Sequence, residues 1–104
     1  MSQTVQRDTE TYMRTESLTD GEYYRLMAVR RRRTTLAALA ELGAPVDLDE
    51  LATAVSKRER ESPAADEATI DRIAVRLHHL HLPKMDALGV LDYDHEANRV
   101  IAAD

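Results

Sequence analysis

The sequence predicts a mainly α-helical domain that carries a small β-hairpin at its C-terminal end. Apolar residues recur at helical spacing in three successive stretches, and capping or stop signals separate these stretches. Two short β-prone runs near the C-terminus flank a polar turn. A chain of 104 residues has room for one domain with a modest core. We expect this domain to span residues 19–104, after a flexible N-terminal arm at residues 1–18 that is polar and has no periodicity.

The first helical region is predicted at about residues 20–42, with a break near Ala28. Asp20 is a candidate N-cap, and Gly43 is a candidate C-cap. Between them, the leucines that follow the four consecutive arginines recur at three-residue spacing.

A short second helix is predicted at about residues 48–59. Asp47 and Glu50 have the spacing of a capping box, in which the first side chain accepts an N–H at the helix start and the second reaches back. A narrow apolar stripe follows at i, i+3, i+4 and i+7. It consists of Leu48, Leu51, Ala52 and Val55.

The third helix is predicted at residues 69–82, with Asp66 as its cap. Its apolar residues fall on one face and comprise Ile70, Ile73, Leu77 and Leu80. Pro83 interrupts the pattern, so we expect a bend near His81 to Pro83.

A β-hairpin is predicted at residues 90–102, with strands at 90–93 and 99–102 around the turn 94–98. An isolated two-stranded hairpin is only marginally stable, so this one has to pack on the helices.

The composition excludes several classes of protein. The chain has no cysteine, which excludes disulfides, thiol catalysis and thiolate zinc sites. It has no run long and apolar enough for a membrane span, and no apolar stretch typical of a signal peptide near its start. No Gly-rich phosphate loop, Ser-His-Asp order or acid pair indicates catalysis. We therefore expect a soluble cytoplasmic protein that is not an enzyme.

Charge is distributed in bands along the chain. The net charge of −5 is divided into −3 for residues 1–22, +4 for 23–44, −4 for 45–68, +2 for 69–84 and −4 for 85–104. Twelve of the fourteen basic residues are arginine, and alanine is abundant. Acidic, lysine-poor composition is typical of proteins adapted to molar salt, where charges are strongly screened. A GC-rich genome that replaces lysine codons by arginine codons is the alternative explanation.

Two stretches resemble a known family. RRRRTTLAALAELGAPVDLDELATAV resembles the opening of ArsR-like winged helix-turn-helix regulators, and LHHLHLPKMDALGVLDYD resembles the end of their recognition helix leading into the first wing strand. Together with RERESP, these stretches are similar to small haloarchaeal winged-helix domains of uncharacterised function. The resemblance covers about residues 23–102 and implies a three-helix core with a two-stranded wing. The linker at 60–69 is longer than the tight turn of a standard helix-turn-helix.

The resemblance implies a DNA-binding transcriptional regulator, often dimeric, without catalytic activity. We therefore expect double-stranded DNA and a second copy of the chain as partners, and neither a membrane nor a small-molecule substrate. The alternative is a winged-helix adapter for protein–protein contact that does not bind DNA. DNA binding requires the positive bands 23–44 and 69–84 on one surface, whereas an adapter would expose an apolar patch.

The predicted third helix supplies the expected contacts to the major groove. Arg72, Arg76 and His79 fall away from its apolar face, and Thr69 lies near the helix start, where a hydroxyl can contact phosphate. Arginine suits this task because its planar fork pairs bidentately with guanine or phosphate. The remaining candidate DNA contacts are Arg30, Arg33, Lys84, His95, Asn98 and Arg99.

Two alternatives concern the same residues. The cluster Arg30–Arg33 could instead neutralise carboxylates of residues 45–68, and Arg32 falls near the apolar stripe of its helix. His78, His79 and His81 are close in sequence, but no third ligand accompanies them at helical spacing, so we expect neither a metal ion nor another cofactor.

Overall fold

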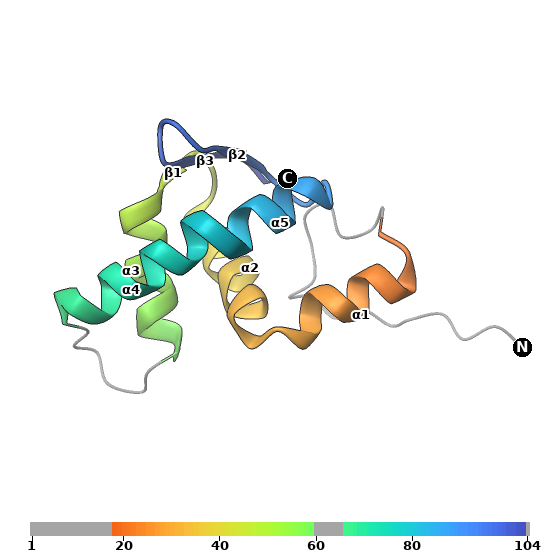
Figure 1. Ribbon diagram of the computed structural model, residues 1–104, viewed down its shortest axis with the longest axis horizontal. Coiled ribbons are helices and arrows are strands. Elements are labelled where there is room, and N and C mark those ends of the chain that lie inside the picture. Colours follow the sequence, from red (N-terminus) through yellow and green to blue (C-terminus); the bar gives the residue numbers. More distant parts are fainter. Residues whose placement is uncertain (1–17, 60–65, 104) are drawn as a thin grey trace, which may run out of the picture.

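The computed structural model describes residues 18–59 and 66–103, which form a mainly helical domain with a small three-stranded antiparallel sheet (Figure 1). In chain order the elements are α1 (Asp20–Ala28), α2 (Arg30–Leu42), β1 (Val46–Asp47), α3 (Leu48–Glu59), α4 (Glu67–Arg76), a π-helical turn (Leu77–His81), α5 (Leu82–Ala87), β2 (Asp92–Asp94) and β3 (Arg99–Ala102).

The first helical region is divided in two, as the sequence predicted. Val29 has extended backbone angles, and its carbonyl accepts the N–H of Arg32 at 2.9 Å at the start of α2. The expected cap of α1 was wrong by one residue, because Thr19 forms a capping box with Glu22. Gly43 closes α2 with a positive φ of 78°, as expected of a C-cap glycine.

The predicted arm lies outside the described residues, except for its last position. Leu18 is only 7% exposed and belongs to the hydrophobic core. The folded domain therefore includes at least one residue that the sequence assigned to the arm.

Helix α3 has the predicted bounds, but Asp47 makes a different contact from the one expected. Its carboxylate accepts a hydrogen bond from Arg99 Nε at 2.9 Å. Asp47 and Val46 form the short strand β1, which pairs with β3 through Val46–Val100 and Asp47–Arg99. The predicted two-stranded hairpin is thus one part of a three-stranded sheet with the order β1-β3-β2.

The third helical region is longer than predicted. Asp66 caps it as expected, accepting the N–H of Thr69 at 2.7 Å. Helical structure then continues through Pro83 to Ala87, so the expected end at residue 82 was wrong.

A π-helical turn explains how the helix passes the proline. Leu82 donates its N–H to the carbonyl of Leu77, five residues earlier. Proline has no N–H, and in a regular helix its ring clashes with the carbonyl four residues before it. The wider turn before Pro83 relieves this clash, so α4 and α5 lie along one rod in Figure 1 instead of separating at a bend.

The turn between β2 and β3 is held at both ends. Asp94 Oδ1 accepts the N–H groups of Glu96 and Ala97 at 3.1 and 3.0 Å. The carbonyl of Asn98, a residue with φ 54°, accepts the N–H of Leu48 at 2.8 Å. These bonds fix the turn against the start of α3.

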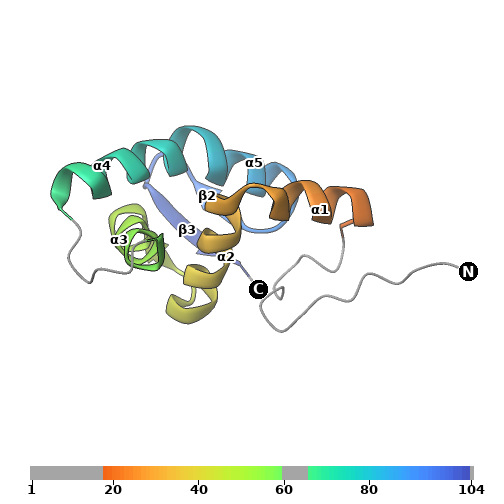
Figure 2. The ribbon, with the colours of Figure 1, turned by 90° about the horizontal axis from the view of Figure 1, so that it is seen from below.

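The hydrophobic core lies between the long α4–α5 rod, α2, α3 and the sheet (Figure 2). Its fully buried large side chains come from all these elements and from α1. They are Leu26, Leu36, Leu39, Leu51, Leu77, Leu82, Met85, Leu91, Val55, Val90 and Val100.

Candidate nucleic-acid interface

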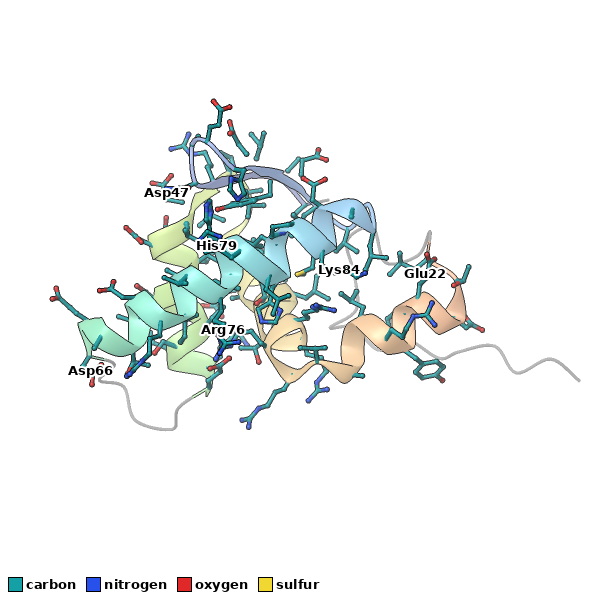
Figure 3. All side chains as sticks on the ribbon, viewed as in Figure 1. Glu22, Asp47, Asp66, Arg76, His79 and Lys84 are labelled. Atoms are coloured by element: carbon teal, nitrogen blue, oxygen red, sulfur yellow. The ribbon has the colours of Figure 1, made fainter. Side chains whose placement is uncertain are left out.

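A surface groove brings together the two positively charged segments of the sequence. It runs between the start of α2 and the edge of α4, so that Arg30 faces the same space as Arg72 and Arg76. Arg76 lies on the side of α4 next to α2 in Figure 3. The groove is lined by Val29, Arg30, Arg31, Glu59, Thr69, Arg72, Ile73, Arg76, Leu80 and His81.

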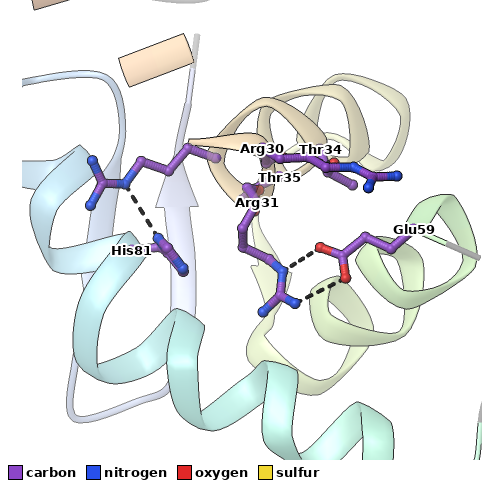
Figure 4. A network of polar contacts seen from close by, with 7 residues as sticks. Arg30, Arg31, Thr34, Thr35, Glu59 and His81 are labelled. Atoms are coloured by element: carbon purple, nitrogen blue, oxygen red, sulfur yellow. Dashed lines mark hydrogen bonds and ion pairs between the residues drawn. The ribbon is translucent and has the colours of Figure 1, made fainter. Parts of the chain in front are cut away.

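One arginine of the groove is neutralised within the domain. Arg31 makes a two-pronged ion pair with Glu59, in which Nη2 lies 2.9 Å from Oε1 and Nε contacts Oε2 (Figure 4). The two side chains are 27% and 19% exposed, respectively. One arginine of the cluster Arg30–Arg33 thus neutralises a carboxylate of residues 45–68, as the alternative interpretation of this cluster predicted.

Arg32 points from α2 to the π-helical turn. Its Nε donates to Nδ1 of His81 at 3.3 Å (Figure 4). Burial, and then the positive charges of Arg32, Arg31 and Arg76, lower the pKa of His81 to about 4, while Glu59 opposes this shift. His81 is therefore neutral near pH 7, which leaves Nδ1 free to accept this hydrogen bond.

The other three arginines of the groove keep their charges available. Among residues 18–59 and 66–103, no carboxylate forms an ion pair with Arg30, Arg72 or Arg76, and all three side chains are exposed. Three exposed guanidinium groups along one groove provide a binding site for an anionic surface. The planar fork of arginine can pair bidentately with phosphate oxygens, as it does with carboxylates.

The long helix also exposes apolar side chains. Val75 is 57% exposed and Leu80 is 46% exposed, next to the exposed Arg76. A face with both guanidinium and apolar groups can donate to phosphates and also contact apolar surface.

A second cluster of predicted residues lies where the same helix meets the β2–β3 turn. The structure places His95, in the β2–β3 turn, against His78 and His79 of the π-helical turn. The rings of His78 and His95 are stacked, with centroids 3.8 Å apart. Sequence reasoning considered only the spacing of histidines within the helix and therefore missed His95 as the third member of this cluster. It included His81 instead, which contacts Arg32 of α2.

The remaining predicted contacts lie outside both the groove and the histidine cluster. Arg99 pairs with Asp47 across the sheet, so its charge is partly offset. Asn98 is exposed beside it, Arg33 is exposed on α2, and Lys84 is exposed on α5 (Figure 3).

Sequence reasoning did not identify the roles of Arg31 and Glu59. Their separation of 28 positions gives no local signal. The only indication was the alternation of positive and negative bands, which predicted pairing between α2 and residues 45–68 without naming the partners.

Among the described residues, no helix is both long and apolar enough to cross a membrane.

Comparisons with known proteins add one finding. Neither the curated proteins nor the solved structures contain a match to this chain. Residues 24–101, about three quarters of the chain, match the family described as "Domain of unknown function (DUF7344)", and the chain therefore belongs to that family.

Proposed function

We propose that this protein is a winged helix-turn-helix domain that binds double-stranded DNA and regulates transcription. The order of α2, β1, α3, α4, β2 and β3 supports a three-helix core followed by a wing, with the α4–α5 rod as the recognition helix. The fold alone does not assign a function, so the proposal depends on the charges at the surface.

The observation that carries the proposal is the convergence of the positive bands in one groove. Arg30 is separated from Arg72 and Arg76 by some forty positions in the sequence, yet all three line the same groove without a described carboxylate partner. In a chain with a net charge of −5, a local group of unpaired arginines is a specific feature. A phosphate contact from Arg30 on α2 would set the position of the long helix on the duplex.

The exposed face of α4 would then read the bases. Arg72 and Arg76 can each donate two hydrogen bonds to guanine, and Val75 can contact the methyl group of thymine. Asn98 in the wing turn is exposed and can reach the backbone of the duplex.

A binding experiment with a matched control tests this proposal. Fluorescence anisotropy with labelled genomic fragments of the source organism would compare the wild type with Arg72→Ala/Arg76→Ala, in both 0.1 M and molar KCl. The control is Lys57→Ala/Arg58→Ala, which removes two exposed positive charges from α3 outside the groove. Circular dichroism would establish that all three proteins are folded.

The proposal predicts that only the groove variant loses affinity, by tenfold or more at 0.1 M KCl. Equal loss in both double variants would mean that general charge, and not the groove, attracts DNA. No binding of any fragment by the wild type at either salt concentration would refute the proposal.

A second candidate function is protein–protein contact, and the exposed Val75 and Leu80 favour it. Large exposed apolar side chains are typical of a docking surface. Val75→Asp would abolish binding to a protein partner, whereas Arg72→Ala would have a small effect.

We also propose a homodimer as the DNA-binding form. Tyr24 on α1 is 60% exposed, whereas its neighbour Tyr23 is buried in the core, so α1 offers an aromatic side chain for contact with a second copy. Light scattering of the wild type and Tyr24→Ser would test this, since a dimer through α1 predicts a monomeric variant.

A further inference from the structure

Three imidazole rings from two separate parts of the chain meet where the long helix touches the wing turn. His78 and His79 belong to the π-helical turn, and His95 follows β2. One ring nitrogen of each lies within 4.8 Å of the others. In Figure 3, His79 lies on the side of the helix that faces the wing.

His78 has a hydrogen-bond partner of the kind that metal-ligating histidines commonly have. Its Nδ1 lies 2.6 Å from the hydroxyl oxygen of Tyr93, on β2. When Nδ1–H donates to this oxygen, the proton is held at Nδ1 and the lone pair is at Nε2. Histidine ligands commonly use one ring nitrogen for the metal and donate a hydrogen bond from the other, which fixes both tautomer and orientation.

We propose that His78, His79 and His95 form a binding site for a zinc-like divalent transition-metal ion, with Tyr93 as a positioning residue. Imidazole nitrogens suit Zn²⁺, Ni²⁺, Cu²⁺ and Co²⁺, and three of them with one open position form a well-known tetrahedral set. The argument for the site does not rest on the proposed function, because none of its three histidines lines the groove of Arg30, Arg72 and Arg76.

The distances are compatible with binding after small side-chain rotations. Zn–N bonds of about 2.0–2.1 Å in a tetrahedron place the nitrogens about 3.4 Å apart. The widest pair therefore has to close by about 1.4 Å from its limit of 4.8 Å. His79 and His95 are exposed side chains at the surface, so their rings can turn without displacing the core.

Binding would add metal–nitrogen bonds to the ring contacts that already join His95 to His78 and His79. The ion would clamp the wing turn to the helix, because His95 comes from the turn and the other two ligands come from the π-helical turn. It would also separate the stacked rings of His78 and His95, since both have to direct a nitrogen at one centre.

Metal titration of the full-length, tag-free protein tests the proposal. The protein is first treated with EDTA, and the EDTA is then removed. Co²⁺ is added and the visible d–d absorption is recorded, after which Zn²⁺ is added to displace the bound Co²⁺. We expect one tightly bound ion per chain with the intense absorption of tetrahedral Co²⁺. Long-range ¹H–¹⁵N spectra should show shifts for His78, His79 and His95 on addition of Zn²⁺. His81, the fourth histidine of the chain, faces Arg32 and provides an internal control that should not shift.

Variants define the ligands. His95→Gln should weaken Co²⁺ binding at least 100-fold, whereas Ala97→Gln places the same side chain in the same turn and should leave binding unchanged. Tyr93→Phe should weaken it about 10-fold while keeping the tetrahedral spectrum, as expected for a positioning residue. The proposal is refuted by binding of several ions per chain with octahedral spectra, by equal shifts of all four histidines, or by His95→Gln and Ala97→Gln behaving alike.

Discussion

Replacing Glu59 with glutamine tests the internal ion pair of the arginine groove separately from the DNA contacts that we propose for it. The carboxylate holds Arg31 in a two-pronged ion pair, and glutamine keeps the shape of the side chain while removing its charge. The substitution therefore weakens an internal contact and releases a fourth guanidinium group to the groove. Folding stability and DNA binding should change in opposite directions.

The expected loss of stability follows from the exposure of the pair. Ion pairs between exposed side chains contribute about 0–1 kcal/mol, and removing one partner of a buried pair costs about 3–5 kcal/mol. The side chains of Arg31 and Glu59 are part-buried, and glutamine still offers one acceptor oxygen, so we expect a loss of about 1–2 kcal/mol. Urea denaturation followed by circular dichroism measures this loss.

The expected gain in DNA binding follows from counterion release. Each additional phosphate contact steepens the dependence of log K on log salt concentration by about 0.9. Glu59→Gln should therefore bind DNA about eightfold more tightly at 0.1 M KCl, with the gain vanishing toward 1 M. Fluorescence anisotropy across a series of KCl concentrations gives both the affinity and the slope.

Glu41→Gln is the matched control, because it changes charge by the same amount at a second arginine–glutamate pair. Arg58 and Glu41 lie outside the groove and are both exposed. We expect a loss of stability below about 0.5 kcal/mol and an unchanged salt slope. If Glu59→Gln left the slope at its wild-type value, or if both variants steepened it equally, the groove would not be the DNA-contacting surface.

Three further predictions concern stability. Ser56→Ala should stabilise the domain by about 1 kcal/mol in urea denaturation, because the hydroxyl is buried without a partner among the described residues. A destabilised variant would show instead that the hydroxyl forms a hydrogen bond. In EDTA, lowering the pH from 6.5 toward 4 should reduce the free energy of unfolding by up to about 3 kcal/mol through His81. The pKa of His81 is about 4 in the folded protein and lower than the pKa of a histidine in the unfolded chain. Protons therefore bind the unfolded state first as the pH falls. The difference in this pH dependence between wild type and His81→Gln measures the effect, and parallel curves would contradict it. Zn²⁺ at a hundred times its Kd should raise stability by about 2.7 kcal/mol in thermal unfolding, EDTA should reverse the rise, and His95→Gln should show none.

Local signals in the sequence predicted most of the helices. Asp66 and Gly43 cap helices at the expected positions, because cap preferences depend only on a few neighbouring residues. The bounds of α3 were confirmed for the same reason. Thr19 was missed because Asp20 beside it is an equally good capping type, and only the backbone geometry decides between them.

Features that depend on distant partners were not predictable in this way. Strand β1 has only two residues and exists because β3 supplies hydrogen bonds from more than fifty positions away. The pairing of Arg31 with Glu59 and the approach of His95 to His78 likewise result from the packing of separate elements. Periodicity describes one element at a time, so it located the arginines and histidines without showing which of them would meet.

Pro83 connects the irregular helix to both candidate sites. A regular helix through this proline would lose a hydrogen bond and clash with the carbonyl of His79, so the chain widens over Leu77–His81. The widened turn holds His78 and His79, which contact His95 of the β2–β3 turn, and it also holds His81, which accepts a hydrogen bond from Arg32 of α2. Helix π-turns are frequent at functional sites because they alter which side chains share a face without ending the helix. The same deviation that accommodates one proline thus lies where two histidines meet His95, directly after the regular helix that carries Arg72 and Arg76 in the groove.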